Sequence, residues 1–329
     1  MMFDLISVGD CMIDSFFILS DAHVACNVDK TKCELCLNYA DKIPVEGFHQ
    51  LVAGNNANNA VGSARLGLKT AAYINIGSDI NGEHVIRKLK EENVDTRYLK
   101  VNKGMDSNAS AVLSFQGERT ILVYHQSWKY HLPDLDNTRW IYFSSVSHSF
   151  SKTELVSQLE NYLERTGARL AYNPGTYQLK YGVKKFPKLL SLMTLIIVNM
   201  EEAKLILGID GSKKIEIKKL LKGLADLGPK LVVITDGSEG SYGYDGVNFY
   251  KLGIFPAKLL EMTGSGDAYA TGLVAGLFYG KDLAEAMRWG AADGASVVEQ
   301  IGPQAGLLTY EQMQYKLRES SHIRAKIFE

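Results

Sequence analysis

The sequence predicts an α/β fold in which a doubly wound, mostly parallel sheet is flanked by helices and carries a small β-rich lid. Short apolar runs of strand length alternate with longer helical patterns along most of the chain. Several of these runs end in polar or glycine-containing turns, as at the carboxyl edge of a parallel sheet, where open α/β folds bind ligands. The 329 residues, 46% of them hydrophobic, suffice to bury the core of such a fold.

The first part of the chain is expected to contain a buried strand and an inserted lid. Residues 3–9 form an apolar run that ends in Gly-Asp, which favours a buried strand. Residues 15–53 show short β-type runs and polar turns without a helical pattern. We therefore expect residues 15–53 to form the lid, with further lid strands within 97–125, and residues 1–14 and 54–329 to form the main domain.

The main domain is expected to alternate strands and helices in chain order. The asparagine-rich stretch after Gly54 passes directly into a small-residue helix that Gly67 closes. Later apolar runs give the remaining elements by the same reasoning. The expected strands are 71–76, 140–144, 168–172, 195–198 and 231–235, with β structure over 109–124, and the expected helices are 60–66, 82–92, 152–166, 265–279 and 283–300.

Composition excludes several classes of partner. The chain has 36 basic and 37 acidic residues and a formal net charge of −1, so it has no global field to attract nucleic acid or an anionic membrane. No apolar run is long enough to span a membrane, and Asp4 lies where a signal peptide would carry positive charge. We expect a cytoplasmic protein with small-molecule partners.

One turn near the C-terminal end combines an anion cradle with a carboxylate. In Thr263-Gly264-Ser265-Gly266-Asp267, two glycines let backbone N–H groups converge, and the following apolar run predicts the helix that they open. Asp267 lies where a carboxylate can accept a proton from a substrate hydroxyl while these N–H groups hold a phosphoryl group. This division of labour favours a kinase. The alternative is a helix start in which Asp267 only complements the helix dipole.

Two other turns follow buried strands and offer groups for a phosphate. Thr235-Asp236-Gly237-Ser238-Glu239-Gly240 presents a hydroxyl and two glycines, although the same stretch also fits a plain β-hairpin. Asn199-Met200-Glu201-Glu202 opens a helix, and Glu202 is a candidate to anchor magnesium through water. The alternative for this second turn is an ordinary acidic first turn of a helix.

Polar residues at the other end of the chain could clamp a polyol. Asp14 follows the first strand, and Gly54, Asn55 and Asn58 lie at the start of the asparagine-rich helix. Carboxylate and amide groups supply the donors and acceptors that several hydroxyls need. The alternative is that the asparagines cap the helix.

The lid contains four residues with zinc-ligand chemistry. His23 and Cys26 are followed by Cys33 and Cys36, and a metal could hold together a lid too small for its own core. The six residues between the two pairs are fewer than zinc modules usually have. A redox pair and inert, packed thiols are the alternatives.

The asparagine-rich helix start, the two turns that could bind phosphate and the turn before Asp267 are four motifs. Together, in their order along the chain, they resemble the ribokinase-like family of carbohydrate and nucleoside kinases, also called the PfkB family. The resemblance covers about residues 4–307. The glycine-rich motif with an internal asparagine, which binds the sugar in that family, is similar to residues 53–67. The motif Thr-Gly-Ala/Ser-Gly-Asp is matched by residues 263–267, Asn-x-x-Glu by residues 199–202 and Thr-x-Gly-x-x-Gly by residues 235–240.

The resemblance implies an ATP-dependent sugar kinase on a ribokinase-like fold, with Mg²⁺ as cofactor. Asp267 would be the general base. The anion hole would be formed by Gly264, Ser265 and Gly266, and Glu202 would anchor magnesium through water. The lid would cover the sugar and, as in many members, form a homodimer. Sugar contacts would come from Asp14, Gly54, Asn55 and Asn58, and ATP contacts from Asn173, Asn199, Thr235, Gly237, Gly240, Ala292, Ser296 and Gly302.

The substrate stays open between two classes. A free sugar such as ribose or a hexose is the first choice, and a nucleoside such as adenosine is the alternative, because four aromatic residues could form a slot for a base. A catalytically silent sugar-binding regulator is less favoured, since the base and the glycines are intact. Potassium dependence is also open, because Glu261-Met262-Thr263 replaces the Asp-Thr-Thr of cation-activated members. The four aromatic residues are Phe16, Phe17, Trp128 and Tyr130.

Overall fold

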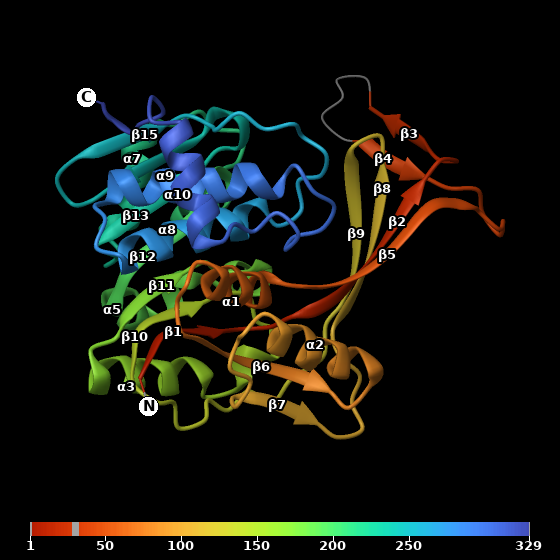
Figure 1. Cartoon of the computed structure of the whole chain (residues 1–329), viewed down its shortest axis with the longest axis horizontal. Coiled ribbons are helices and arrows are strands. Elements are labelled where there is room, and N and C mark those ends of the chain that lie inside the picture. The colour runs from red at the N-terminus through yellow and green to blue at the C-terminus, as the bar shows by residue number, and fades with distance from the viewer. Residues whose placement is uncertain (1, 28–32, 329) are drawn as a thin grey trace.

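A ten-stranded sheet forms the centre of the protein, and a separate four-stranded sheet projects from it (Figure 1). The computed structural model describes residues 2–27 and 33–328. The central sheet has the strand order β16-β15-β14-β13-β12-β11-β10-β1-β6-β7, and it is parallel from β13 to β7. The doubly wound, mostly parallel sheet predicted from the sequence is confirmed. The strands are β1 (Phe3–Val8), β6 (Thr70–Gly77), β7 (Leu99–Asn102), β10 (Thr138–Phe143), β11 (Arg169–Tyr172), β12 (Met193–Asn199), β13 (Leu231–Thr235), β14 (Ser241–Tyr244), β15 (Phe249–Leu252) and β16 (Lys326–Ile327).

Helices pack on both faces of this sheet because successive strand residues point to opposite sides. In β12, Leu195 and Ile197 join the core formed with α8, α9 and α10, whereas Ile196 and Val198 join the core formed with α3, α5, α6 and α7. No helix in the described part of the chain is long and apolar enough to cross a membrane. The helices are α1 (Asn55–Arg65), α2 (Ile80–Glu91), α3 (Leu155–Thr166), α4 (Thr176–Tyr181), α5 (Pro187–Leu192), α6 (Met200–Leu207), α7 (Ile217–Ala225), α8 (Ser265–Phe278), α9 (Leu283–Val297) and α10 (Tyr310–Glu319).

The helix after Gly54 begins earlier than predicted. The sequence pattern placed its start at residue 60, but α1 begins at Asn55 and includes the asparagine run. The side chains of Asn56 and Asn59 bond distant groups: Asn56 Nδ2 donates to the carbonyl of Gly9 at 2.9 Å, and Asn59 Nδ2 donates to Thr271 Oγ1 at 3.2 Å. These tertiary bonds stabilise asparagines at helical positions that their intrinsic propensity disfavours.

Several short elements were not anticipated from the sequence. The helices α4 and α5 have six residues each, which is too short for a clear helical period. The helix α10 did carry a signal, because Thr309 and Gln312 form a capping box at its start. The 3₁₀ turns are His148–Lys152, Val183–Lys185 and Gly237–Glu239.

The projecting sheet combines strands from two parts of the chain. It has the order β5-β2-β8-β9, in which β2 pairs antiparallel with β5 and parallel with β8. The strand β2 begins at Met12, so the chain enters this sheet just before residue 15. We refer to these four strands as the lid sheet. They are β2 (Met12–Leu19), β5 (Val45–Ala53), β8 (Ala109–Phe115) and β9 (Glu118–Tyr124).

The proposed zinc set does not converge on one point. In the two-stranded sheet of β3 (His23–Cys26) and β4 (Cys33–Cys36), His23 pairs with Cys36 and Cys26 pairs with Cys33. Residues three positions apart on a strand point to opposite faces, so the two pairs lie on opposite sides of the ribbon. Cys26 and Cys33 form a disulfide, and Cys36 is a free thiol. The zinc prediction is therefore wrong for this structure.

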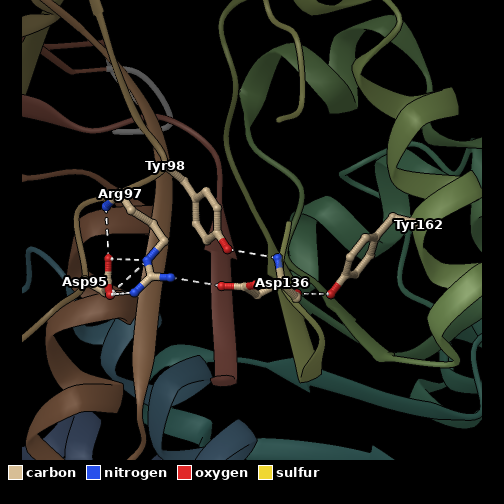
Figure 2. A network of polar contacts seen from close by, with 5 residues as sticks. All are labelled: Asp95, Arg97, Tyr98, Asp136 and Tyr162. Carbon is tan, nitrogen blue, oxygen red and sulfur yellow. Dashed lines mark hydrogen bonds and ion pairs between the residues drawn. The ribbon is translucent and has the colours of Figure 1, made fainter. Parts of the chain in front are cut away.

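A network of polar side chains fixes the amino edge of the parallel sheet (Figure 2). Arg97 bonds Asp95 through its Nη2 at 2.8 Å and Asp136 through its Nη1 at 3.0 Å. Tyr98 and Tyr162 bond the backbone of Asp136 from either side, each at 2.8 Å. Since Asp136 precedes β10 and Asp95 pairs with the start of β6, this network lies at the edge opposite the carboxyl ends of the strands. It stabilises the sheet away from the candidate site.

Candidate active site

Three of the predicted motifs lie at the carboxyl edge of the parallel sheet. Asn199 ends β12 and pairs with Thr235 at the end of β13. Asn173 follows β11, and Tyr142 OH in β10 donates to Asn173 Oδ1 at 3.2 Å. Burial raises the pKa of Tyr142, and the charges of Asp267 and Glu202 raise it further, so both carboxylates lie near this residue. Motifs that are far apart in the sequence therefore lie near one another at this edge.

The turn before α8 has the conformation that the glycine motif predicts. Gly264 caps α8 with a φ of 84°, and a Cβ atom there would overlap Pro303, so a side chain is excluded on two grounds. A Cβ atom at Gly266 would meet no atom within 4 Å. The first N–H groups of a helix lack partners within that helix. The Ser265 N–H donates to the carbonyl of Met262 at 3.3 Å, which leaves those of Gly266 and Asp267 suited to bind an anion.

Asp267 lies in the first turn of α8 with a perturbed acidity. Burial raises its pKa to about 6, the charges of Asp14 and Glu202 add to the rise, and a hydrogen bond from Asn58 opposes it. Asn58 Nδ2 donates to Asp267 Oδ2 at 2.7 Å. A carboxylate with a pKa near neutrality is a suitable general base for a hydroxyl.

Asp14 lies on β2 of the lid sheet and faces the same region. Only 6% of its surface is exposed, and Ser110 Oγ of β8 donates to its Oδ1 at 2.5 Å. Burial raises the pKa of Asp14, and the charge of Glu261 raises it further. The lid sheet therefore contributes one carboxylate to the site.

The start of α1 links the lid sheet to the site. Gly54 has a φ of 97°, and a Cβ atom there would lie 2.9 Å from the Cα of Cys11, so this position requires glycine. Asn55 is partly exposed at the first position of α1, and Asn58 is 2% exposed. Gly54 therefore allows the backbone to pass close to Cys11. The Asn58 side chain, one turn further along α1, bonds the proposed base Asp267.

Asn199 and Glu202 form a reciprocal capping box. Asn199 Oδ1 accepts from the Glu202 N–H, and Glu202 Oε2 accepts from the Asn199 N–H, both at 2.9 Å. The ordinary helix-start interpretation of this motif is thus correct for its local structure. Burial at the sheet edge also raises the pKa of the Glu202 carboxyl group.

The turn after β13 is both a hairpin and a glycine-lined loop. Thr235 ends the strand, and β14 and β15 form the hairpin predicted as the alternative. Gly240 has a φ of 90°, and a Cβ atom there would overlap the carbonyl oxygen of Leu252. Gly237 has a φ of 51° with open space around it. Gly240 is therefore needed for the fold, and Gly237 leaves room for a ligand.

The three residues predicted beside adenine lie on α9 and in the loop that follows it. Ala292 has no exposed surface within α9, whereas Ser296 is partly exposed. Gly302 lies in the loop after α9, where a Cβ atom would overlap the side chain of Leu51 in the lid sheet. Their contact with adenine, which the family resemblance implies, stays a prediction.

Two residues near the site were missed from the sequence. Gln304 Nε2 donates to Asn58 Oδ1 at 3.0 Å, and Ser110 bonds Asp14 as described above. Neither belongs to a motif, and each reaches the site through a partner more than ninety positions away in sequence. No local signal in the sequence would have identified them.

The acidity of Asp267 predicts a pH dependence. Its pKa is raised to about 6, and a base must be ionised to accept a proton. We therefore expect kcat/KM to fall with decreasing pH through about 6 and to level off above it. Initial rates between about pH 5 and about pH 8 check this, and a rate that is constant down to about pH 5 would contradict it.

This arrangement suits the transfer of a phosphoryl group to a hydroxyl, because free helix N–H groups and a desolvated carboxylate lie together at the ligand-binding edge. The class of protein is a phosphotransferase with an alcohol group as acceptor. The chain belongs to the pfkB family of carbohydrate kinases, whose family model matches residues 4–309. The family resemblance predicted from the motifs is thus confirmed.

Individual relatives agree with this assignment. The chain is 23% identical over 315 residues to an ATP-dependent 6-phosphofructokinase of Thermoanaerobacterium thermosaccharolyticum, covering 91% of this chain and 89% of the relative. It is 30% identical over 271 residues to a 5-dehydro-2-deoxygluconokinase of Clostridium tetani, covering 76% and 79%. The fold is similar to that of Arabidopsis thaliana ribokinase complexed with ribose and ATP, with a TM-score of 0.78, 19% identity and coverage of 97% and 99%.

Proposed function

We propose that this kinase transfers the γ-phosphoryl group of ATP to a hydroxyl of a small sugar. The observation that carries the proposal is the convergence of three carboxylates from separate parts of the chain, among them Asp267, which Asn58 holds by a hydrogen bond at 2.7 Å. Burial raises the pKa of Asp267, and the charges of Asp14 and Glu202 raise it further. Asp14 comes from the lid sheet, Glu202 from the edge of β12 and Asp267 from the start of α8. A sugar against Asp14 and a triphosphate against the sheet edge would meet at Asp267.

The proposed reaction is an in-line displacement. The substrate hydroxyl gives its proton to Asp267 as its oxygen bonds the γ-phosphorus, and the bond from that phosphorus to the β,γ-bridging oxygen breaks to release ADP. The N–H groups at the start of α8 stabilise the charge on the transferring group. The hydrogen bond from Asn58 holds the Asp267 carboxylate in place during the transfer.

Glu202 fits the role of a magnesium anchor through water. Its Oε2 is engaged by the backbone of Asn199, which fixes the carboxylate at the phosphate-binding edge, and burial raises its pKa. Magnesium is usually held by one or two carboxylates together with water and phosphate oxygens. Bound there, magnesium would neutralise charge on the triphosphate.

The structure favours a sugar over a nucleoside. Trp128 and Tyr130, two of the aromatic residues that could have formed a slot for a base, are 1% and 4% exposed in the main core. Tyr130 OH donates to Asp10 Oδ2 at 2.6 Å, which fixes it in that core. Phe16 is 2% exposed, and Phe17 packs against Phe48 at 5.2 Å between ring centroids. These residues therefore do not form an open aromatic slot.

A panel of acceptors tests this proposal. ATP consumption is measured with free sugars, sugar acids, phosphosugars and nucleosides, and phosphorylated products are identified by mass spectrometry. We expect at least one sugar-derived acceptor to give kcat/KM at least about tenfold above every nucleoside. A nucleoside preference would replace the sugar by the nucleoside alternative. Sugar binding without any ATP consumption would instead support the silent regulator.

We further propose that the lid sheet forms a homodimer. The edge strand β9 is exposed along its whole length and carries four consecutive large apolar residues, of which Leu122 is 59% and Tyr124 52% exposed. An exposed apolar edge strand has unpaired backbone groups and favours pairing with another chain. A second copy that presents the same strand would cover both edges by two-fold symmetry.

Leu122→Lys is expected to convert this dimer into a monomer. A charge on the buried side of the interface would have no partner, while the exposed position should leave the fold intact. Light scattering after gel filtration should give twice the 36.4 kDa chain mass for the wild type and the single chain mass for the variant. Leu205→Lys is the matched control, because Leu205 is a 56% exposed leucine in α6. A monomeric wild type would refute the proposal.

A further inference from the structure

The side chain of Gln304 is connected to the proposed base through one intervening residue. Gln304 Nε2 donates to Asn58 Oδ1 at 3.0 Å, and Asn58 Nδ2 donates to Asp267 Oδ2 at 2.7 Å. Gln304 lies in the loop between α9 and α10, Asn58 in α1 and Asp267 in α8. In both hydrogen bonds the donor therefore lies on the Gln304 side and the acceptor on the Asp267 side. Gln304 itself lies outside the four motifs.

Gln304 is held rigidly in this place. It is 6% exposed, and Arg65 Nη1 donates to its backbone carbonyl at 2.7 Å and to that of Leu307 at 3.2 Å. Arg65 is fixed in turn by its ion pair with Glu92 at 2.6 Å. Within the described residues, Gln304 Oε1 is buried without a hydrogen-bond partner. Burying this oxygen without a partner lowers the stability of the fold. The Gln304 side chain makes its hydrogen bond to Asn58.

The direction of these bonds decides which end of the Asn58 amide faces the base. An amide can present either its NH₂ group or its oxygen, and the oxygen would repel an ionised carboxylate. The groups that act on Asp267 from α6 and the lid sheet, Glu202 and Asp14, are acidic. In the described part of the chain, it is the Asn58 side chain that donates a hydrogen bond to Asp267.

We propose that Gln304 is a positioning residue that orients the Asn58 amide so that its NH₂ group faces Asp267. The inference rests on the proposed function of Asp267 as the general base. Gln304 does not contact the carboxylate itself, so its effect on the rate passes through Asn58. A donor at position 304 keeps Oδ1 of Asn58 turned away from the base, whereas an acceptor at position 304 would draw the NH₂ group away.

Two variants and a double-mutant cycle test this inference. Gln304→Met removes the donor at similar size, and we expect kcat to fall about fivefold; Gln304→Glu replaces the donor by an acceptor, and we expect a fall of about thirtyfold. The KM for ATP should change less than about twofold, because the Gln304 side chain bonds Asn58 and not the proposed ATP-binding motifs at Asn199 and Thr235. In an Asn58→Ala background, both substitutions should change kcat less than about twofold.

The acidic limb of the pH profile gives a second readout. Loss of the Asn58 donor should move that limb of kcat/KM to higher pH in both Gln304 variants, because the hydrogen bond from Asn58 lowers the pKa of Asp267. Gln300→Glu is the matched control, since Gln300 is exposed in the same loop region, and it should keep the wild-type rate and profile. Thermal unfolding shows whether each variant is folded.

The outcomes separate this inference from the proposed function. If Asp267→Asn is inactive but the Gln304 variants lose the same factor with and without Asn58, then Gln304 acts by packing and the inference fails alone. The inference also fails if Gln304→Glu is as active as the wild type. If Asp267→Asn is active, the base assignment fails first. If Gln304→Glu does not fold, the Gln304→Met cycle decides.

Discussion

Replacing Asp267 by Asn is expected to lower kcat by at least about a thousandfold while the Kd for ATP changes less than about threefold. An amide keeps the shape of the carboxylate and can still accept the hydrogen bond from Asn58, but it cannot take the proton of the acceptor hydroxyl. Because the change affects the transition state more than binding, kcat and kcat/KM should fall together. Steady-state kinetics and calorimetric titration with ATP measure the two quantities.

A surface carboxylate provides the control for this experiment. Asp226 caps the end of α7 and is exposed, so Asp226→Asn should keep the wild-type rate. An Asp267→Asn variant that retains about a tenth of the wild-type kcat would exclude Asp267 as the base. The amount of folded variant is established by its thermal unfolding before the rates are compared.

Gly266→Ala is expected to lower kcat about a hundredfold without lowering Tm. A Cβ atom at this position meets no protein atom within 4 Å, and alanine is favoured over glycine in a helix by about 1 kcal/mol, so the fold should tolerate it. The methyl group would instead occupy the space where the transferring phosphoryl group approaches the N–H groups of α8. Activity and stability should therefore change independently.

Gly264→Ala is the contrasting variant. Its Cβ atom would overlap Pro303 at a φ of 84°, so we expect Tm and kcat to fall together. Differential scanning calorimetry and steady-state rates on the same samples separate the two cases. Full activity of Gly266→Ala would show that the phosphoryl group does not pass over this turn.

The fold was predictable where sequence patterns are local and repeated. The buried strand at Leu195–Val198 is apolar on both faces, and the turns after such strands are polar because they lie at the ligand-binding edge. The conformation of Gly264 was predictable for a similar reason, since a tight approach before a helix leaves few alternatives to glycine. Alternation and turn chemistry thus predicted the sheet and the edge at which the candidate site lies.

Long-range contacts account for what could not be predicted. The early start of α1 depends on bonds from Asn56 and Asn59 to distant residues, and propensity alone argues against it. The zinc hypothesis had the right residue types but required the register of β3 and β4, which puts His23 and Cys26 on opposite faces. Gln304 is similar, because its role depends on a partner 246 positions away.

Two strands of the lid sheet, β2 and β5, are joined to the main domain by short connections. Gly9, Asp10 and Cys11 are the residues between β1 and β2, and Gly54 alone separates β5 from α1. These two connections touch, since a Cβ atom on Gly54 would lie 2.9 Å from Cys11. A displacement of β5 would therefore act directly on the first turn of α1, the helix that carries Asn58.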